Sequence, residues 1–138
     1  MTNKEKKAYL YRYRNLEKSI ERLMEEAERW RLKAEKMTQT ISDMPHGGDG
    51  EDQRELAICS MIDCAREATE KANEQMVMKR EIEKTIESVG DDRLELLLVY
   101  RYIDGEQWED ITRLLDCSWS HTHRLHAIAL EKINIQME

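Results

Sequence analysis

The sequence contains no phenylalanine, a single proline and five glycines, and only 6% of its 138 residues are aromatic. Strands favour β-branched and aromatic residues, and turns between strands need glycine and proline, so this composition argues against a β-sheet. The chain is instead rich in Glu, Lys, Arg, Leu, Met and Ala, which favour helices. The sequence therefore predicts an all-α protein.

Long apolar runs are also lacking. No stretch approaches the roughly 18 residues that a membrane span requires, and the first residues, MTNKEKKAYL, lack the apolar core of a signal peptide. The chain has three cysteines, and an odd number without an export signal is typical of free thiols in a reducing compartment. These absences predict a cytoplasmic protein with no membrane association.

The chain also has no overall positive charge, because its net charge is −7. Residues 1–42 carry 11 Lys/Arg against 7 Asp/Glu, residues 43–90 carry 6 against 12, and residues 91–138 carry 5 against 10. Any contact with nucleic acid must therefore come from local patches. The basic start of the chain is one candidate for contact with a phosphate backbone, through Lys4, Lys6, Lys7, Arg12 and Arg14.

A heptad pattern of apolar residues runs from Tyr9 to Ile41. Its members follow one another at alternating four- and three-residue steps: Tyr9, Tyr13, Leu16, Ile20, Leu23, Ala27, Trp30, Ala34, Met37 and Ile41. This spacing is typical of a left-handed coiled-coil seam. The pattern predicts a long helix that packs against a partner helix.

A break at residues 42–50, which contains Pro45 and three glycines, separates this helix from a second one. We expect the second helix from Glu51 to about Ser88. Its apolar residues are Ile58, Met61, Ile62, Ala65, Ala68, Ala72, Met76, Ile82 and Ile86. A short loop makes two helices antiparallel neighbours. Residues 1–89 are therefore expected to form a long antiparallel helical hairpin, which packs on the C-terminal segment, on another subunit, or on both.

Residues 90–138 have the layout of a helix-turn-helix domain. A helix from Arg93 is followed by a short helix from Trp108 to Leu115, a tight turn, and a last helix from Ser118 to about Ile133. Ser118 is expected to cap the last helix. The expected core positions are Leu96, Leu97, Val99, Tyr100, Trp108, Ile111, Leu114, Leu115, Thr122, Leu125, Ala129, Leu130 and Ile133.

Residues 99–133 resemble the region-four helix-turn-helix of bacterial sigma-70 factors. The matching residues are Tyr102, Gly105, Glu109 or Asp110, Ile111, Leu115, Ser118, Ala129, Leu130, Lys132 and Ile133. Asp116 departs from the pattern at the glycine of the turn, although Asp tolerates a left-handed conformation better than most residues. Gln107 stands where Ser or Thr would cap the short helix. With its long N-terminal helices, the whole chain resembles a phage and prophage family grouped with late-transcription regulators of the ArpU type.

The stretch LLDCSWSHTHRLH, residues 114–126, concentrates potential metal ligands. Cys117 and His121 are four residues apart and can face together, whereas His123 lies about 200° around the helix from His121, near His126. Two half-sites on different faces do not form one closed metal site. A thiol that fills the core at Cys117 is inert, so we expect neither an enzyme nor a bound cofactor.

The same stretch fits contact with DNA. If Ser118 caps the last helix, the exposed front of that helix carries Trp119, Ser120, His121, His123 and Arg124. Residues at this position of a recognition helix reach base edges and phosphates in the major groove. Arg124 is the strongest candidate for a guanine or phosphate contact. Protonation of His123 is expected to raise the affinity as the pH falls toward 6.

These features predict a phage- or prophage-encoded transcriptional regulator that binds double-stranded DNA. The resemblance to sigma factors adds host RNA polymerase as a possible partner, and the long helices suggest a homodimer. Two alternatives stay open. One is a DNA-recognition subunit in phage packaging, similar to a small terminase, in which the helices build a ring. The other is a helical adaptor that does not contact DNA directly.

Overall fold

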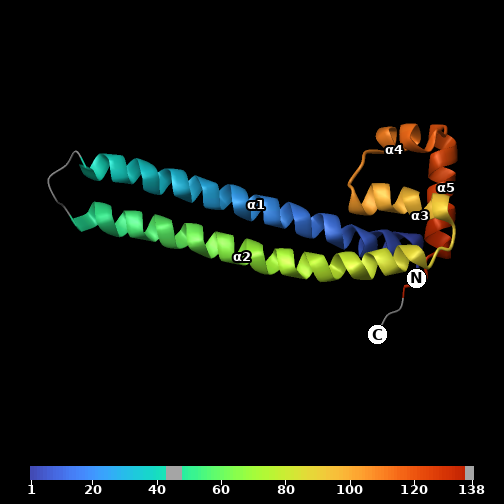
Figure 1. Ribbon diagram of the computed structural model, residues 1–138, viewed down its shortest axis with the longest axis horizontal. Helices are drawn as coiled ribbons and strands as arrows, with labels where there is room; N and C mark the ends of the chain where they lie inside the picture. Colours follow the sequence, from blue (N-terminus) through green and yellow to red (C-terminus); the bar gives the residue numbers. More distant parts are fainter. Residues whose placement is uncertain (43–47, 136–138) are drawn as a thin grey trace. The chain divides into compact units, whose positions relative to one another are not determined.

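A computed structural model describes residues 1–42 and 48–135 of the chain (Figure 1). It confirms the prediction of an all-α protein, because the described residues contain helices and no strand. The helices are α1 (Asn3–Ser42), α2 (Gly48–Glu87), α3 (Asp92–Leu98), the π-helix η1 (Val99–Ile103), α4 (Trp108–Leu115) and α5 (Trp119–Lys132). Pro45 and the rest of residues 43–47 lie outside the described residues.

The chain divides into two compact units. The core unit comprises residues 1–16 and 75–138, and the hairpin unit comprises residues 17–74. Both long helices therefore contribute to both units, because their ends next to Met1 and Glu87 pack with the C-terminal helices. The expected domains, residues 1–89 and 90–138, stay a prediction. The core unit contains residues from both of them.

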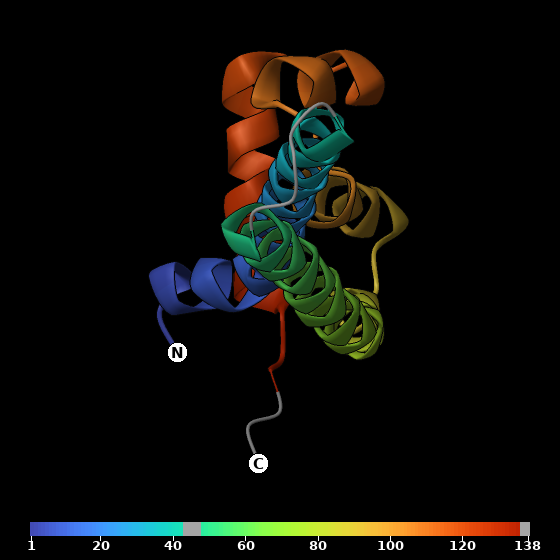
Figure 2. The same cartoon turned by 90° about the vertical axis from the view of Figure 1, so that its left-hand side faces the viewer.

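In the hairpin unit, α1 and α2 lie side by side in both views of the molecule (Figures 1 and 2). The heptad seam faces α2: Ala34 is buried, and Ile20, Leu23, Ala27, Trp30 and Met37 are half-buried. Near the far end of the pair, Arg54 Nε donates a hydrogen bond to Thr38 Oγ1 at 2.6 Å. The long helix and its seam as far as Met37 are thus found where the sequence predicts them, and the side chain of Ile41 lies outside the described residues.

The second helix differs from its predicted form in two respects. It begins at Gly48, three residues before the expected start at Glu51. In addition, Ile62 and Met76 are exposed, whereas Ala57, outside the expected stripe, is buried. A pair of helices buries only one stripe on each partner, so a broad apolar face cannot be covered within the hairpin.

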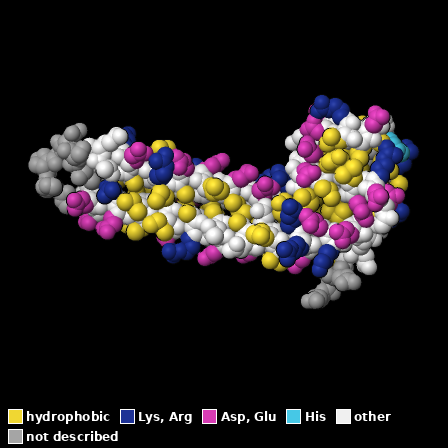
Figure 3. Space-filling model, viewed as in Figure 1, with side chains coloured by type: hydrophobic (Ala, Val, Ile, Leu, Met, Phe, Trp, Pro, Cys, Tyr) yellow, Lys and Arg dark blue, Asp and Glu magenta, His cyan; other side chains and the backbone are white. Residues whose placement is uncertain are grey.

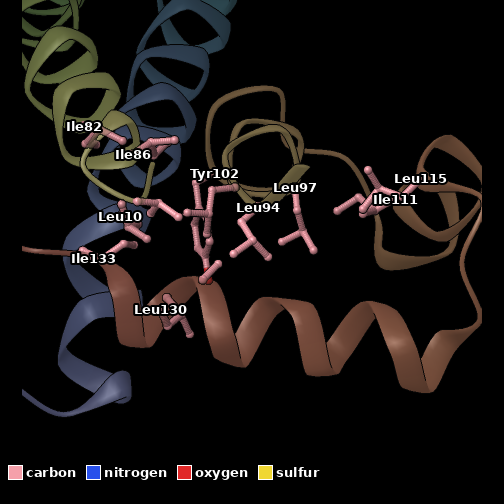
Figure 4. Close-up of a cluster of buried hydrophobic side chains, with 13 residues drawn as sticks. Leu10, Ile82, Ile86, Leu94, Leu97, Tyr102, Ile111, Leu115, Leu130 and Ile133 are labelled. Carbon is pink, nitrogen blue, oxygen red and sulfur yellow. The ribbon is translucent and has the colours of Figure 1, made fainter. Parts of the chain in front are cut away.

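The core unit is built around large buried side chains from six helices. Figure 4 shows most of them: Leu10, Ile82, Ile86, Leu94, Leu97, Tyr102, Ile111, Leu115, Leu130 and Ile133. In this core α3 packs against α5 and η1, and α4 packs against α5 and η1. Burying each large apolar side chain stabilises the fold by about 1.5–3 kcal/mol relative to leaving it in water. The end of α1 belongs to this core because Leu10 is completely buried.

Two expected core residues point outward instead. Leu96 is 41% exposed and Leu114 is 53% exposed, so the predictions for both were wrong. Helix α3 turns Leu94, Leu97 and Leu98 inward, and this three- and four-residue spacing leaves Leu96 on the opposite side. The short helix α4 likewise buries Ile111 and Leu115, which share one face, and Leu114 lies about 100° around the helix from Leu115.

The caps and turns follow the sequence closely. The Asp91 side chain accepts hydrogen bonds from the backbone N–H groups of Arg93 and Leu94 at the start of α3. Ser118 Oγ accepts from the His121 N–H at 3.1 Å, which confirms the predicted cap of α5. Asp116 has the left-handed conformation expected for the turn, with φ 53° and ψ 49°. Gln107 makes no side-chain cap, as predicted.

The π-helix η1 and the loop after it were not predicted. The Asp104 N–H donates to the Val99 carbonyl at 2.9 Å, which widens the last turn of the helix. Gly105 follows with a φ of 71°. A Cβ at this glycine would collide with the guanidinium of Arg14, so the Arg14 side chain, from the N-terminal part of α1, lies against this loop.

Alanine substitutions of two glycines test this approach. Gly90→Ala is the matched control, since Gly90 has a φ of 76° and no described atom lies within 4 Å of the position that its Cβ would take. A left-handed conformation costs an L-residue about 1–2 kcal/mol, so both variants lose that much unfolding free energy. Gly105→Ala is expected to lose about 0.5 kcal/mol more, because the flexible end of the Arg14 side chain must move to another rotamer. Urea titration measures the difference, and equal losses in the two variants would contradict the close approach.

Candidate nucleic-acid interface

The candidate interface is the N-terminal half of α5. Trp119 is 54% exposed, Ser120 and Arg124 are exposed, and His121 is half-buried. The first turn of α5 contains no acidic residue, whereas α3 and α4 both begin with carboxylates. Because the N–H groups and dipole of a helix start favour anions, the start of α5 is the most favourable of these three helix starts for a phosphate.

Three of the predicted interface residues are neighbours on the surface of α5. Arg124 lies four residues after Ser120 and three after His121, and this spacing places the side chains next to one another. Arg124 forms no hydrogen bond or ion pair with the part of the chain that the structure describes. Its guanidinium therefore keeps all five N–H donors available for a ligand.

His123 lies between two tryptophans rather than on the open surface. Its ring centroid is 4.5 Å from that of Trp108 and also 4.5 Å from that of Trp119. Its Nε2 is buried and has no hydrogen-bond partner among the described residues. The DNA contact predicted for His123 stays a prediction. In the structure the His123 ring packs between the rings of Trp108 and Trp119.

His126 belongs to the core. Its Nε2 shares a hydrogen bond of 2.7 Å with the Tyr102 hydroxyl, and the two rings are stacked with centroids 5.8 Å apart. The rings of Trp108 and His126 pack edge to face, with centroids 4.7 Å apart. Burial lowers the pKa of His126 to about 4, and the nearby cationic Lys7 and Arg101, together with His123, contribute to this lowering. Burial also raises the pKa of Tyr102. Both groups are therefore neutral at pH 7.

Arg101 connects α1 with α4. Its guanidinium lies over the ring of Trp108 at 4.8 Å and over the ring of Tyr11 at 5.6 Å. It donates hydrogen bonds to the Tyr11 hydroxyl and to the Glu106 carbonyl. Tyr11 also meets Tyr102 edge to face, with centroids 5.4 Å apart. A continuous series of rings therefore runs from Trp119 at the surface to Tyr11 on α1.

The basic start of the chain is largely engaged within the fold. Lys6 Nζ donates to the Leu130 carbonyl at 2.8 Å, and so stabilises the C-terminal end of α5. Arg12 lies 4.1 Å from the ring centroid of Tyr9 and pairs with Glu81 at 3.8 Å. Arg14 is held beside Gly105. Lys4 and Lys7 are exposed, and the phosphate contact expected of this basic start stays a prediction.

The Cys/His cluster does not come together. Cys117 is half-buried, and Arg93 contacts both its sulfur and the Leu115 carbonyl, whereas the expectation was a fully buried thiol. Within residues 1–42 and 48–135, no group of three or more His, Cys, Asp and Glu side chains is arranged to hold a metal ion. The same ranges contain no helix with the length and apolar content needed to cross a bilayer.

Sequence reasoning missed the residues that hold α5 in place. Tyr11 is off the heptad seam, and Arg101 lies next to Tyr102 without matching the helix-turn-helix pattern itself. Their common signal is the clustering of aromatic residues at the start of α1, in η1 and at the start of α4. Periodicity within a single helix cannot show which rings from different helices meet.

The pH dependence of stability tests the environment of His126. The unfolded His126 binds a proton near pH 6.5 and the folded one near pH 4. Its contribution to stability is therefore full above pH 6.5, falls as the pH decreases, and is lost below pH 4. Between pH 7 and pH 5 the wild type should lose about 2 kcal/mol more unfolding free energy than His126→Gln, which cannot titrate there. Parallel profiles in urea titrations would refute the assignment.

Comparison of the chain with protein-family models, curated protein sequences and solved structures finds no match. The resemblance of residues 99–133 to sigma region four consequently stays a hypothesis carried by the residues themselves. The function of the chain has to be inferred from the side chains on α5 and from the contacts that hold this helix.

Proposed function

We propose that this chain is a DNA-binding transcriptional regulator in which α4 and α5 form a helix-turn-helix and α5 enters the major groove. The observation that carries the proposal is the start of α5. It combines a Ser118 cap, a first turn without carboxylates, and a surface on which Trp119, Ser120 and Arg124 are exposed and His121 is half-buried. Those residue types supply an aromatic face, hydroxyl and imidazole hydrogen-bonding groups, and a forked cation.

The charge of the core unit is compatible with this role. Its 13 Lys/Arg stand against 14 Asp/Glu, so the unit is close to neutral although the whole chain carries −7. The acidic residues at the start of α4, Glu109 and Asp110, are partly offset by an ion pair between Asp110 and Arg113. With so few cations near α5, non-specific attraction to phosphates is weak, and affinity must come from direct contacts.

The contacts that hold α5 in place favour direct recognition of base edges by its side chains. Recognition of base edges requires side chains that are held on a rigid element. The Tyr102–His126 hydrogen bond fixes the middle of α5, Lys6 binds its C-terminal carbonyls, and Trp108 packs against His123 near its N-terminus. In a sigma-like role, RNA polymerase would supply further contacts and thereby offset the low charge.

Selection of bound sequences from random duplex DNA tests the proposal. Purified full-length protein is used alone and in the presence of bacterial RNA polymerase, and enriched sequences are read after several rounds. Enrichment of a defined site in either arm supports a DNA-binding regulator. Absence of enrichment in both arms would contradict it and would favour an adaptor role.

Arg124→Ala tests the role of α5 on a selected site. Loss of one good guanine or phosphate contact costs about 1–3 kcal/mol, so the Kd should rise roughly 5- to 150-fold. Lys132→Ala is the matched control, because Lys132 is an exposed cation in the last turn of the same helix. It should change the Kd less than about twofold. Fluorescence anisotropy at fixed salt measures both variants, and equal affinities for Arg124→Ala and wild type would rule out this contact.

A further inference from the structure

None of the large apolar side chains described in the hairpin unit is fully buried, and several are exposed. Its buried apolar residues, among those that the structure describes, are Ala34, Ala57 and Ala68. Met24 is 61% exposed and Ile62 is 46% exposed. Large side chains supply most of the hydrophobic stabilisation of a helical bundle, and one stripe of alanines supplies little. The unit therefore has an apolar surface that a further partner can bury.

Part of this surface is a groove between α1 and α2, with a volume of about 380 Å³. Its lining residues are Ile20, Met24, Ala27, Glu28, Arg31, Met61, Ala65, Ala68, Thr69 and Ala72. In the view of Figure 3, hydrophobic side chains gather along the junction of the two long helices. The α1 side of the groove carries bulky Ile20 and Met24, whereas the α2 side is mostly alanine. The groove therefore combines large side chains on α1 with small side chains on α2, against which the large side chains of another molecule can pack.

We propose that two copies of this chain pair through this groove and form a four-helix bundle, with α1 of each copy on α2 of the other. A twofold axis along the hairpin brings Met24 of one copy onto Ala65 and Ala68 of the partner subunit, and the reverse contact forms at the same time. Neighbouring helices in this arrangement are antiparallel, as in most four-helix bundles. The pairing does not depend on the proposed DNA binding.

The size of the unit suits such a pairing. Its part of α1 contains about 26 residues, so each helix is about 39 Å long, and two helices side by side are roughly 20 Å wide. One face therefore offers roughly 800 Å², which is about the area that each partner buries in a stable interface of standard size.

The charge of the unit disfavours anionic occupants and fits the proposed arrangement of a second copy. The hairpin unit carries 9 Lys/Arg against 15 Asp/Glu, which disfavours nucleic acid and anionic lipid surfaces. Residues 17–42 carry 6 Lys/Arg against 6 Asp/Glu, whereas residues 48–74 carry 3 against 8. Pairing α1 with α2 of the partner avoids the repulsion of two acidic helices, because each acidic helix faces a neutral one.

The mass in solution tests the pairing. Light scattering on the full chain between 1 and 100 µM should give twice the 16.4 kDa of one chain. Met24→Glu and Ala65→Glu should shift the dimer toward the monomer and raise the dissociation constant at least tenfold. Leu56→Glu is the matched control, because Leu56 is 66% exposed on α2 but does not line the groove. It should leave the mass unchanged.

Four outcomes of this measurement would overturn the proposal. They are a monomeric wild type at 100 µM, an assembly of eight or more subunits, a Met24→Glu dimer as stable as the wild type, and a Leu56→Glu protein that dissociates as readily as the groove variants. Failure to select a DNA site would leave these masses unaffected, so the two proposals fail separately.

Disulfide cross-linking provides a second test that does not rely on weakening the dimer. Met24→Cys and Ala65→Cys are placed in separate proteins whose three native cysteines are replaced by serine. Oxidation of the mixture should give a cross-linked dimer containing one copy of each, at least tenfold more than either protein gives alone. Cross-linking of Met24→Cys to itself, without the mixed product, would overturn the arrangement of α1 on α2.

Discussion

The hydrogen bond between the Tyr102 hydroxyl and His126 Nε2 is the interaction on which the core unit depends. It lies in the core, joins η1 to α5, and satisfies two polar groups that would otherwise be buried without a partner. Leaving one of them unpaired would cost about 1–3 kcal/mol. Tyr11 and Trp108 pack on this pair, so elements from both ends of the sequence converge on it. The contact therefore helps to hold α5 against η1, together with the buried apolar residues of α5.

The same arrangement separates residues of similar chemistry into different roles. His126 is neutral and structural, His123 fills the space between two tryptophans, and His121 is half-buried at the surface. The stretch that resembles a metal site in sequence therefore has two structural roles. His123 and His126 pack inside the core unit, whereas His121 lies at the surface of α5. Trp119 belongs to both, because its ring rests on His123 while more than half of the side chain is exposed.

Much of the fold could be predicted from the sequence, for identifiable reasons. The heptad spacing, the Ser118 cap and the left-handed Asp116 are local signals, and the structure confirms them. The π-helix η1 and the contacts of Arg101 could not be predicted, because they depend on rings from separate helices. Leu96 and Leu114 were misplaced because apolar character alone does not fix which of several neighbouring leucines faces the core. The expected interface residues stay a prediction, although Trp119, Ser120 and Arg124 are exposed and His121 and His123 are half-buried.

Mapping the DNA-contacting surface by NMR tests the central claim most directly. Backbone amide signals of the full chain are followed while a selected duplex is added, and the residues whose signals move are located. The proposed role of α5 predicts that the largest shifts fall on residues 118–124, with smaller shifts on α4 and none concentrated in the hairpin unit. Shifts that concentrate in residues 17–74, or that leave residues 118–124 unchanged, would contradict the proposal that α5 reads DNA.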